Sequence, residues 1–184
     1  MKHLQEITLS SQKIYEGRIL NLRVDQVLLP NGKQSSREVV EFSEAVTIVA
    51  VTPEQKVLLV NQYRYPVAEI LLEAPAGKKD PGESPESCAR RELQEETGYT
   101  AGTLQKICEF YTTPGFTNEL MHVFLARDLT PGQQKPDEDE FLQVTEVDLQ
   151  EALDMIYHGQ IRDGKTIAGL LAAFNLLQKN NFAE

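Results

Sequence analysis

The stretch that most constrains this chain is Gly77–Tyr99, which reads GKKDPGESPESCARRELQEETGY. Ser84 is a preferred helix N-cap, and Pro85 stands at the first helical position, where its missing N–H costs nothing. Residues 86–97 contain no Gly or Pro, and Gly98 suits the left-handed conformation that often ends a helix. The sequence therefore predicts a helix of about three turns.

One face of this predicted helix carries three carboxylates. Glu92, Glu95 and Glu96 are spaced i, i+3 and i+4, so they share a face. Their repulsion costs roughly a few tenths of a kcal/mol per exposed pair, and more where the pair is partly buried. A hard cation such as Mg²⁺ would relieve it, because Mg²⁺ prefers oxygen ligands and keeps places for water and substrate phosphate. The alternative is an ordinary solvated acidic face.

Residues beside the helix could support such a site. Arg91 lies one turn before Glu95 and can pair with it, or with Glu83 at the helix entrance. The segment Pro75–Gly77 would let the backbone approach a ligand closely. The carbonyl of Ala76 is therefore a candidate additional metal ligand.

Composition narrows the class of protein. With 184 residues we expect one domain, or one domain with an N-terminal arm. The net charge of −10 disfavours nucleic acid or an anionic membrane as the main partner. The chain has two cysteines, Cys88 and Cys108, and no apolar run of the ~20 residues that span a membrane. These observations predict a soluble cytoplasmic protein.

The chain before the motif is expected to be mostly strand. Residues 13–42 are β-rich, and Pro30–Gly32 contains the Asn–Gly pair typical of a hairpin turn. Because a lone hairpin is marginal, it should pack on the rest of the chain or on a second copy. Residues 45–51 and 56–63 predict buried strands. Arg64, directly after them, could clamp an anionic substrate or be an ordinary surface arginine.

The chain after the motif predicts strands at 107–111, 120–126 and 141–147 and helices at 147–157 and 165–178. The connection Thr112–Glu119 is where a recognition loop would lie. Residues 127–139 predict a mobile loop whose end joins the acidic cluster 137–140. That cluster is either solvated or, beside a metal-binding helix, a source of an added ligand or a general base.

The segment 159–166 (GQIRDGKT) matches the phosphate-binding P-loop pattern, but a strand should feed a P-loop and a helix is predicted there instead. We expect Gly159 to end one helix and Asp163 or Gly164 to cap the next.

The fixed positions of Gly77–Tyr99 resemble the Nudix hydrolase signature. Membership would imply an α/β fold, an α/β/α sandwich with a mixed sheet, and hydrolysis of a nucleoside diphosphate linked to another moiety. Pro114, sixteen residues beyond Gly98, resembles the mark of bacterial ADP-ribose pyrophosphatases within this family, as do the REVVE and QYRYP segments. The implied reaction is Mg²⁺-dependent hydrolysis of ADP-ribose to AMP and ribose 5-phosphate. The alternatives are another nucleotide-sugar or dinucleotide substrate, or a non-catalytic ADP-ribose-sensing module.

The resemblance also implies roles for individual residues. The implied metal ligands are Ala76, Glu92, Glu95, Glu96 and Glu140. They would bind about two or three Mg²⁺ ions, with Mn²⁺ as a possible substitute. The general base is Glu140, with Glu138 as runner-up, while Glu83 and Arg91 fix the loop and helix geometry.

Substrate binding is implied for a second group. Arg64 resembles the arginine that binds phosphate, and Arg37 with Glu38 resembles the contacts near adenosine. Glu119 resembles the carboxylate that binds the terminal ribose, in the loop that carries Pro114 and Gly115. The adenine contact stays open between Arg37 and Tyr15.

The same resemblance implies a homodimer. Residues 1–42 would form an N-terminal β segment exchanged between subunits and contributing substrate contacts. Residues 43–184 would form the Nudix hydrolase domain.

Overall fold

The computed structural model describes residues 2–138 and 140–181, and the chain divides into two compact units. The first unit contains the chain up to Glu44 together with Tyr111–Leu120. The second contains Ala45–Phe110 and the chain from Met121 onward. Each unit is described by itself.

The first unit is an antiparallel sheet of three strands in the order β1-β2-β3. Its strands are β1 (Ile7–Glu16), β2 (Asn21–Leu28) and β3 (Gln34–Glu41), preceded by a short 3₁₀ helix, Lys2–Leu4. The expected hairpin joins β2 to β3, with Gly32 at φ 80°. β1 begins at Ile7, before the β-rich region that the sequence predicts. Because every residue of β1 is exposed, no buried apolar face marks it in the sequence.

The predicted recognition loop belongs to this first unit. Backbone N–H of Val40 donates to the carbonyl of Phe116 at 2.8 Å, and Val40 forms a parallel bridge with Thr117. The N–H of Phe42 donates to Asn118 Oδ1 at 2.8 Å. The loop is thus attached to the end of β3, far from it in sequence.

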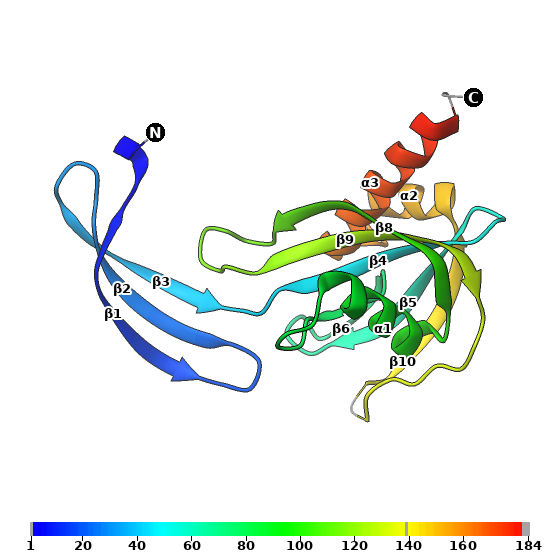
Figure 1. Ribbon diagram of the computed structural model, residues 1–184, viewed down its shortest axis with the longest axis horizontal. Coiled ribbons are helices and arrows are strands. Elements are labelled where there is room, and N and C mark those ends of the chain that lie inside the picture. Colours follow the sequence, from blue (N-terminus) through cyan, green and yellow to red (C-terminus); the bar gives the residue numbers. More distant parts are fainter. Residues whose placement is uncertain (1, 139, 182–184) are drawn as a thin grey trace. The chain divides into compact units, whose positions relative to one another are not determined.

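The second unit contains a mixed sheet of seven strands in the order β10-β5-β4-β9-β8, with β6 paired to β5 and β7 to β4 (Figure 1). β4 and β9 run parallel, whereas β5 is antiparallel to β4, β6 and β10. The strands are β4 (Ala45–Val51), β5 (Lys56–Arg64), β6 (Glu69–Glu73), β7 (Ala76–Lys78), β8 (Thr100–Tyr111), β9 (Leu120–Thr130) and β10 (Leu142–Asp148).

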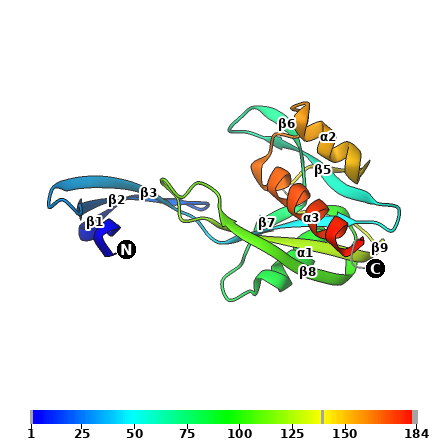
Figure 2. The same cartoon turned by 90° about the horizontal axis from the view of Figure 1, so that it is seen from above.

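Helices cover both faces of this sheet (Figure 2): α1 (Pro85–Thr97) on one side, α2 (Leu149–Tyr157) and α3 (Gly164–Asn181) on the other. Successive strand residues point to opposite faces. In β4, Val46 and Ile48 therefore pack with Leu93 of α1, whereas Val49 packs with Leu170 of α3. The predicted α/β fold with a mixed sheet is confirmed.

Several predicted boundaries were wrong. β9 runs to Thr130, so the loop predicted at 127–139 begins later. β10 extends to Asp148, whose side chain caps α2 by accepting the N–H groups of Gln150 and Glu151. The short strands β6 and β7 were not predicted. Their three to five residues are too few for a periodic pattern to show, and only pairing with β5 and β4 defines them.

The P-loop-like segment joins two helices, as expected. Gly159 follows α2 with φ 71°, and Asp163 caps α3 by accepting the N–H of Thr166 at 2.9 Å. Within the described residues, no helix has both the length and the apolar character needed to cross a membrane.

Candidate active site

The motif helix α1 has the predicted ends. Ser84 Oγ accepts the N–H of Ser87 at 3.1 Å, and Pro85 occupies the first turn. Gly98 adopts the left-handed conformation, φ 79°, and its N–H donates to the carbonyl of Gln94. The chain therefore fixes both ends of the helix that presents the carboxylates.

The three carboxylates of α1 do not share one environment. Glu92 and Glu96 are buried, whereas Glu95 is only half-buried. Glu96 Oε2 accepts the N–H of Ala76 at 3.1 Å. Glu92 lies against Gly77, where a Cβ would come within 2.0 Å of the Glu92 carboxylate. The backbone at 76 and 77 thus forms a wall directly beside the two buried acids.

Burial makes the ionised forms of these two acids costly. It raises the pKa of Glu92 to about 7, opposed by Arg91 and supported by the charges of Glu95 and Glu140. It raises the pKa of Glu96 to about 8, opposed by the Ala76 N–H and supported by Glu92 and Glu140. Two adjacent acids that resist ionisation beside a backbone wall form a site that a cation would stabilise.

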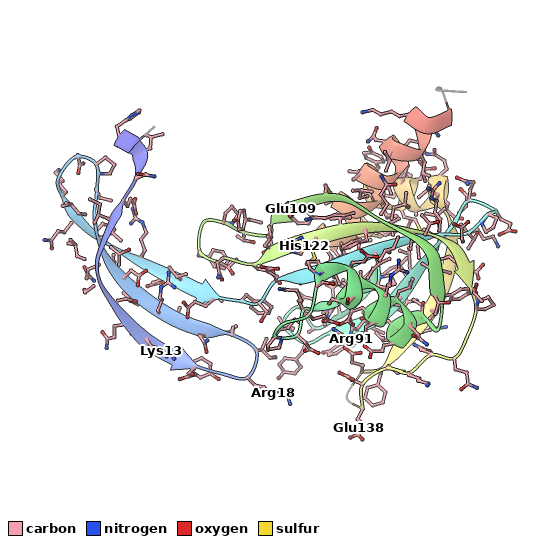
Figure 3. All side chains as sticks on the ribbon, viewed as in Figure 1. Lys13, Arg18, Arg91, Glu109, His122 and Glu138 are labelled. Carbon is pink, nitrogen blue, oxygen red and sulfur yellow. The ribbon has the colours of Figure 1, made fainter. Side chains whose placement is uncertain are left out.

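Arg91 links the helix to the loop before it (Figure 3). Its Nε and Nη2 donate to Glu83 at 3.1 and 3.0 Å, and its Nη1 donates to Glu92 at 2.7 Å and Glu95 at 2.9 Å. Glu83 in turn accepts the N–H of Asp80 at 3.1 Å. The Arg91 hydrogen bonds lower the pKa of Glu83 to about 2. The sequence left two partners open for Arg91, and the structure gives it both.

The donors fit a hard divalent ion. Two buried carboxylates one turn apart and the backbone at Ala76 offer oxygen ligands, and Mg²⁺ commonly completes its shell with water and substrate phosphate. In the part of the chain that the structure describes, no group of three or more His, Cys, Asp or Glu side chains is placed to hold a metal ion.

The acidic loop is anchored to the end of α1. The N–H of Lys135 donates to the carbonyl of Glu95 at 2.9 Å, and Gln134 Nε2 donates to the carbonyl of Glu96 at 2.7 Å. The charge of Glu140 reaches Glu92 and Glu96, since it raises the pKa of both. Glu138 is exposed in the same loop (Figure 3).

Glu140 also lines an open cavity of about 700 Å³. The other lining residues come from β5, β6, the acidic loop and β10: Asn61, Tyr63, Ile70, Gln134, Pro136, Phe141, Leu142 and Gln143.

Arg64, at the end of β5, binds a buried acid that the sequence did not single out. Its Nε donates to Glu73 Oε1 at 2.8 Å and its Nη2 to Glu73 Oε2 at 2.7 Å. Lys165, from the P-loop-like segment, donates to the same carboxylate. The charge of Glu96 is among the causes that raise the pKa of Arg64, so the pair lies near the motif helix.

The chain was compared with known proteins. Residues 41–169 match the NUDIX domain, and residues 6–40 match the nucleoside diphosphate sugar hydrolase N-terminal domain. The chain belongs to the Nudix family. Members of this family typically use a divalent metal ion.

Two curated relatives of this Nudix chain cover most of its length. The ADP-ribose pyrophosphatase of Bacillus subtilis (strain 168) is 48% identical over 168 residues, 90% of this chain and 91% of the relative. The methanol dehydrogenase activator of Bacillus methanolicus is 42% identical over 168 residues, with the same coverage. A crystal structure of an ADP compounds hydrolase, 24% identical, covers 96% of both chains with a TM-score of 0.87, which shows the fold.

The remaining predicted site residues of this Nudix protein lie in its first unit. Arg37 Nε donates to Glu6 Oε2 at 2.9 Å, and its Nη1 donates to the carbonyl of Ser36 at 2.8 Å. Glu119 Oε2 accepts the hydroxyl of Thr112 at 2.7 Å. Glu38, Pro114 and Gly115 are exposed. The structure thus groups Arg37, Glu38 and the 112–119 loop in one unit, and Arg64, Glu140 and the motif in the other.

Sequence reasoning missed Glu73 and assigned Lys165 no role. Two signals could have found them. Glu73 is an acid placed directly after the apolar residues 70–72 of EILLE, and Lys165 follows the cap of a predicted helix inside a segment already noted for its unusual pattern.

Proposed function

We propose that this Nudix hydrolase cleaves the pyrophosphate bond of ADP-ribose with water, giving AMP and ribose 5-phosphate, and that it requires Mg²⁺. One observation carries the proposal: Glu92 and Glu96 are buried together beside the backbone of Ala76 and Gly77, with pKa values raised by burial. The choice of substrate is supported by the 48% identity to an ADP-ribose pyrophosphatase over 90% of the chain.

The residues that would hold Mg²⁺ are Glu92, Glu96 and the carbonyl of Ala76, with Glu95 and Glu140 as further ligands. When bound, Mg²⁺ neutralises the diphosphate and lowers the pKa of a coordinated water, and Mn²⁺ can supply the same chemistry. Arg91 would hold Glu92 and Glu95 in orientation, because it donates to both while it is fixed by Glu83.

Proton transfer falls to the acidic loop. We assign Glu140 as the general base that takes the proton of the attacking water, because its charge reaches both buried motif acids. Glu138 is exposed and is the weaker candidate. The loop is attached to α1 through Gln134 and Lys135 and continues into β10, and we expect its closure over substrate to bring Glu140 toward the attacking water.

In this proposal each unit supplies candidate substrate-binding residues of its own. Arg64 would bind the diphosphate, because Glu73 occupies its Nε edge and leaves Nη1 to an anion. Arg37 and Glu38 would bind near adenosine, and Glu119 in the loop with Pro114 and Gly115 would bind the terminal ribose. Tyr15 and Arg37 remain the candidates for the adenine contact.

The first unit would serve dimerisation. All of β1 is exposed, including the apolar side chains of Ile7, Leu9 and Ile14, which favours an occupant of similar apolar character. We propose that a second copy of the chain is that occupant, with the N-terminal β segment (residues 1–42) exchanged between subunits and the Nudix domain (43–184) carrying the chemistry. The free thiols of Cys88 and Cys108 suit a cytoplasmic location.

The test is a substrate panel with purified full-length protein and Mg²⁺. ADP-ribose, ADP-glucose, GDP-mannose, NADH and a diadenosine polyphosphate are compared by kcat/KM, with products identified by chromatography. We expect ADP-ribose to be preferred and AMP to be released. A clear preference for another compound would reject the substrate assignment.

Glu92→Gln provides the matched variant for the metal site, and Glu86→Gln is its control. Both make the same chemical change on α1, but Glu86 is an exposed first-turn residue that pairs with Arg90. We expect Glu92→Gln to lose about a thousandfold or more in kcat/KM and Glu86→Gln to stay near wild type. Calorimetry with Mg²⁺ alone measures metal binding in the absence of substrate. It should show Mg²⁺ binding by Glu86→Gln and not by Glu92→Gln.

A second candidate function is a sensing or activating role, because a relative of 42% identity is named an activator of another enzyme. The same substrate panel tests it. If the chain bound ADP-ribose without cleaving it, a sensing or activating role would replace the catalytic one.

A further inference from the structure

The Glu73 carboxylate, which binds Arg64 at the end of β5, also binds Lys165 of α3. Glu73 ends β6 and is 1% exposed. Its two oxygens accept Nε and Nη2 of Arg64, and Oε2 also accepts Nζ of Lys165. One buried carboxylate therefore joins the end of β5 to the first turn of α3. A carboxylate so buried needs such partners to stay ionised, and their hydrogen bonds and charges lower its pKa against the opposing effect of burial.

The first turn of α3 makes a second attachment to the residue that directly follows β6. Asp163 Oδ2 accepts the N–H of Thr166 at 2.9 Å and its hydroxyl, and lies 3.0 Å from Nζ of Lys165. The Thr166 hydroxyl oxygen accepts the N–H of Ala74 at 2.8 Å. Glu73 and Ala74 are thus held side by side by two consecutive residues of α3.

The strand segment held in this way leads directly to the motif carboxylates. The Pro75 carbonyl accepts the N–H of Ile48 at 2.8 Å, and the N–H of Ala76 donates to Glu96 at 3.1 Å. Gly77 then lies against Glu92. The segment 73–77 is therefore held by α3 at Glu73 and Ala74 and contacts the α1 carboxylates at Ala76 and Gly77.

Sharing Glu73 also fixes the direction of Arg64. The carboxylate takes the Nε–Nη2 edge of the guanidinium, and among the described residues no hydrogen bond is found to Nη1. The Arg64 side chain is 38% exposed. If Lys165 did not hold Oε2, the Glu73 carboxylate could rotate about its last torsion, which is a soft one, and carry the guanidinium with it.

We propose that Lys165 is a positioning residue for diphosphate binding. It fixes the Glu73 carboxylate, and Glu73 in turn presents the Nη1 edge of Arg64 to an anionic substrate. Lys165 itself need not touch the substrate. The inference rests on the proposed function, since it assigns the anion that Arg64 binds to the diphosphate of that reaction.

The experiment compares Lys165→Met, which keeps the aliphatic stem, with Lys165→Arg, which keeps the charge. Lys179→Met, an exposed lysine in the last turn of the same helix, is the matched control. We expect Lys165→Met to raise the KM for ADP-ribose about tenfold with a smaller change in kcat, Lys165→Arg to recover most of the loss, and Lys179→Met to match wild type. If Lys165→Met fails to fold, Lys165→Gln replaces it with the same expectation.

A double-mutant cycle decides whether Lys165 acts through Arg64. In an Arg64→Lys background, Lys165→Met should change KM by less than about twofold, because the group it positions is gone. Full additivity of the two changes, or a Lys165→Met enzyme with wild-type KM, overturns the proposal.

A measurement without substrate separates this proposal from the proposed function. The Nε–H signal of Arg64 in a ¹⁵N-correlated spectrum, assigned by its loss in Arg64→Lys, reports the Glu73 contact directly. We expect Lys165→Met to shift the signal or speed its exchange with water, and Lys179→Met to leave it unchanged. An unchanged signal in Lys165→Met overturns the positioning role. If the wild-type protein cleaves no nucleoside diphosphate but Lys165→Met still changes the Arg64 signal, the proposed function is overturned, whereas the positioning of Arg64 by Lys165 through Glu73 stands.

Discussion

Gly77 lies so close to Glu92 that a Cβ at position 77 would stand 2.0 Å from Glu92 Cδ. Non-bonded carbon atoms do not approach so closely, so any side chain at 77 must displace the carboxylate or the strand that carries the glycine. The glycine of the motif is thus required by contact and not by a special backbone angle, because its φ is not positive. The absence of a side chain at Gly77 lets the backbone pack directly against the buried Glu92 carboxylate.

Gly77→Ala should therefore abolish activity. We expect a loss of at least about a hundredfold in kcat/KM, because displacement of Glu92 removes a ligand, and a cost of about 1–3 kcal/mol in the free energy of unfolding. Gly164→Ala, where a Cβ would meet nothing within 4 Å, is the control and should leave both unchanged. Steady-state kinetics and urea unfolding measure the two quantities. A Gly77→Ala enzyme as active as Gly164→Ala would contradict the close packing described above.

The metal-free protein should lose stability as the pH rises. Folding raises the pKa of Glu92 to about 7 and of Glu96 to about 8, so the folded state binds protons that the unfolded state has already released. This contribution is complete below about pH 4.5, the unfolded pKa, and declines until about pH 8. Thermal unfolding in EDTA at pH 5.5, 7 and 8.5 should show the melting temperature falling stepwise, as the free energy of unfolding decreases by about a few kcal/mol at most.

Mg²⁺ should weaken or reverse that trend, because it binds the ionised carboxylates and its affinity rises with pH. The double variant Glu92→Gln/Glu96→Gln serves as the control and should give a flatter profile that Mg²⁺ does not alter. A wild-type melting temperature that rises between pH 5.5 and 8.5 in EDTA would show that other groups dominate.

Glu140 should matter more than Glu138. Replacing Glu140 by Gln removes a charge that reaches both buried motif acids, whereas Glu138 is exposed. We expect Glu140→Gln to lower kcat by about a hundredfold or more, and Glu138→Gln by less than about threefold. The pair of variants differs only in position along the loop, so the comparison controls for the loss of one charge. The reverse order would assign the base to Glu138.

Removing Arg91 should cost both stability and activity. Arg91→Met leaves Glu83 without the partner that lowers its pKa to about 2 and frees Glu92 and Glu95 to move. Because Arg91 is about a third exposed, solvent moderates the effect, and we expect roughly 1–2 kcal/mol in the free energy of unfolding. Activity should fall by more than stability explains. Arg90→Met, whose partners are Glu86 and the carbonyl of Ala101, is the control on the neighbouring position.

The dimer can be tested through β1. Ile7→Ser/Ile14→Ser replaces two exposed apolar side chains of that strand, and Val67→Ser makes the same kind of change at an exposed valine of the second unit. Sedimentation should show a dimer for wild type and Val67→Ser and a monomer, or a weakened dimer, for the β1 variant. Activity should fall with dissociation, since each site would be built from two chains. A monomeric and fully active wild type would refute the dimer.

The sequence by itself determined where the motif helix begins and ends and which glutamates share one of its faces. Ser84, Pro85 and Gly98 act on the backbone within a few residues, and the spacing of Glu92, Glu95 and Glu96 follows from helix geometry alone. The sequence also predicted the hairpin before the motif, the cap at Asp163 and the buried strands β4 and β5, because each depends on local chemistry or on a short periodic pattern.

Only the tertiary structure decided how these parts meet. No local rule distinguishes Glu92 and Glu96, which are buried and hard to ionise, from Glu95, which stays half-exposed with Arg91. None pairs Glu73 with Lys165, 92 residues further along the chain, or places that carboxylate between Lys165 and Arg64. Burial and the protonation of an acid depend on every element packed around it, and those contacts exist only once the sheet has brought distant strands and helices together.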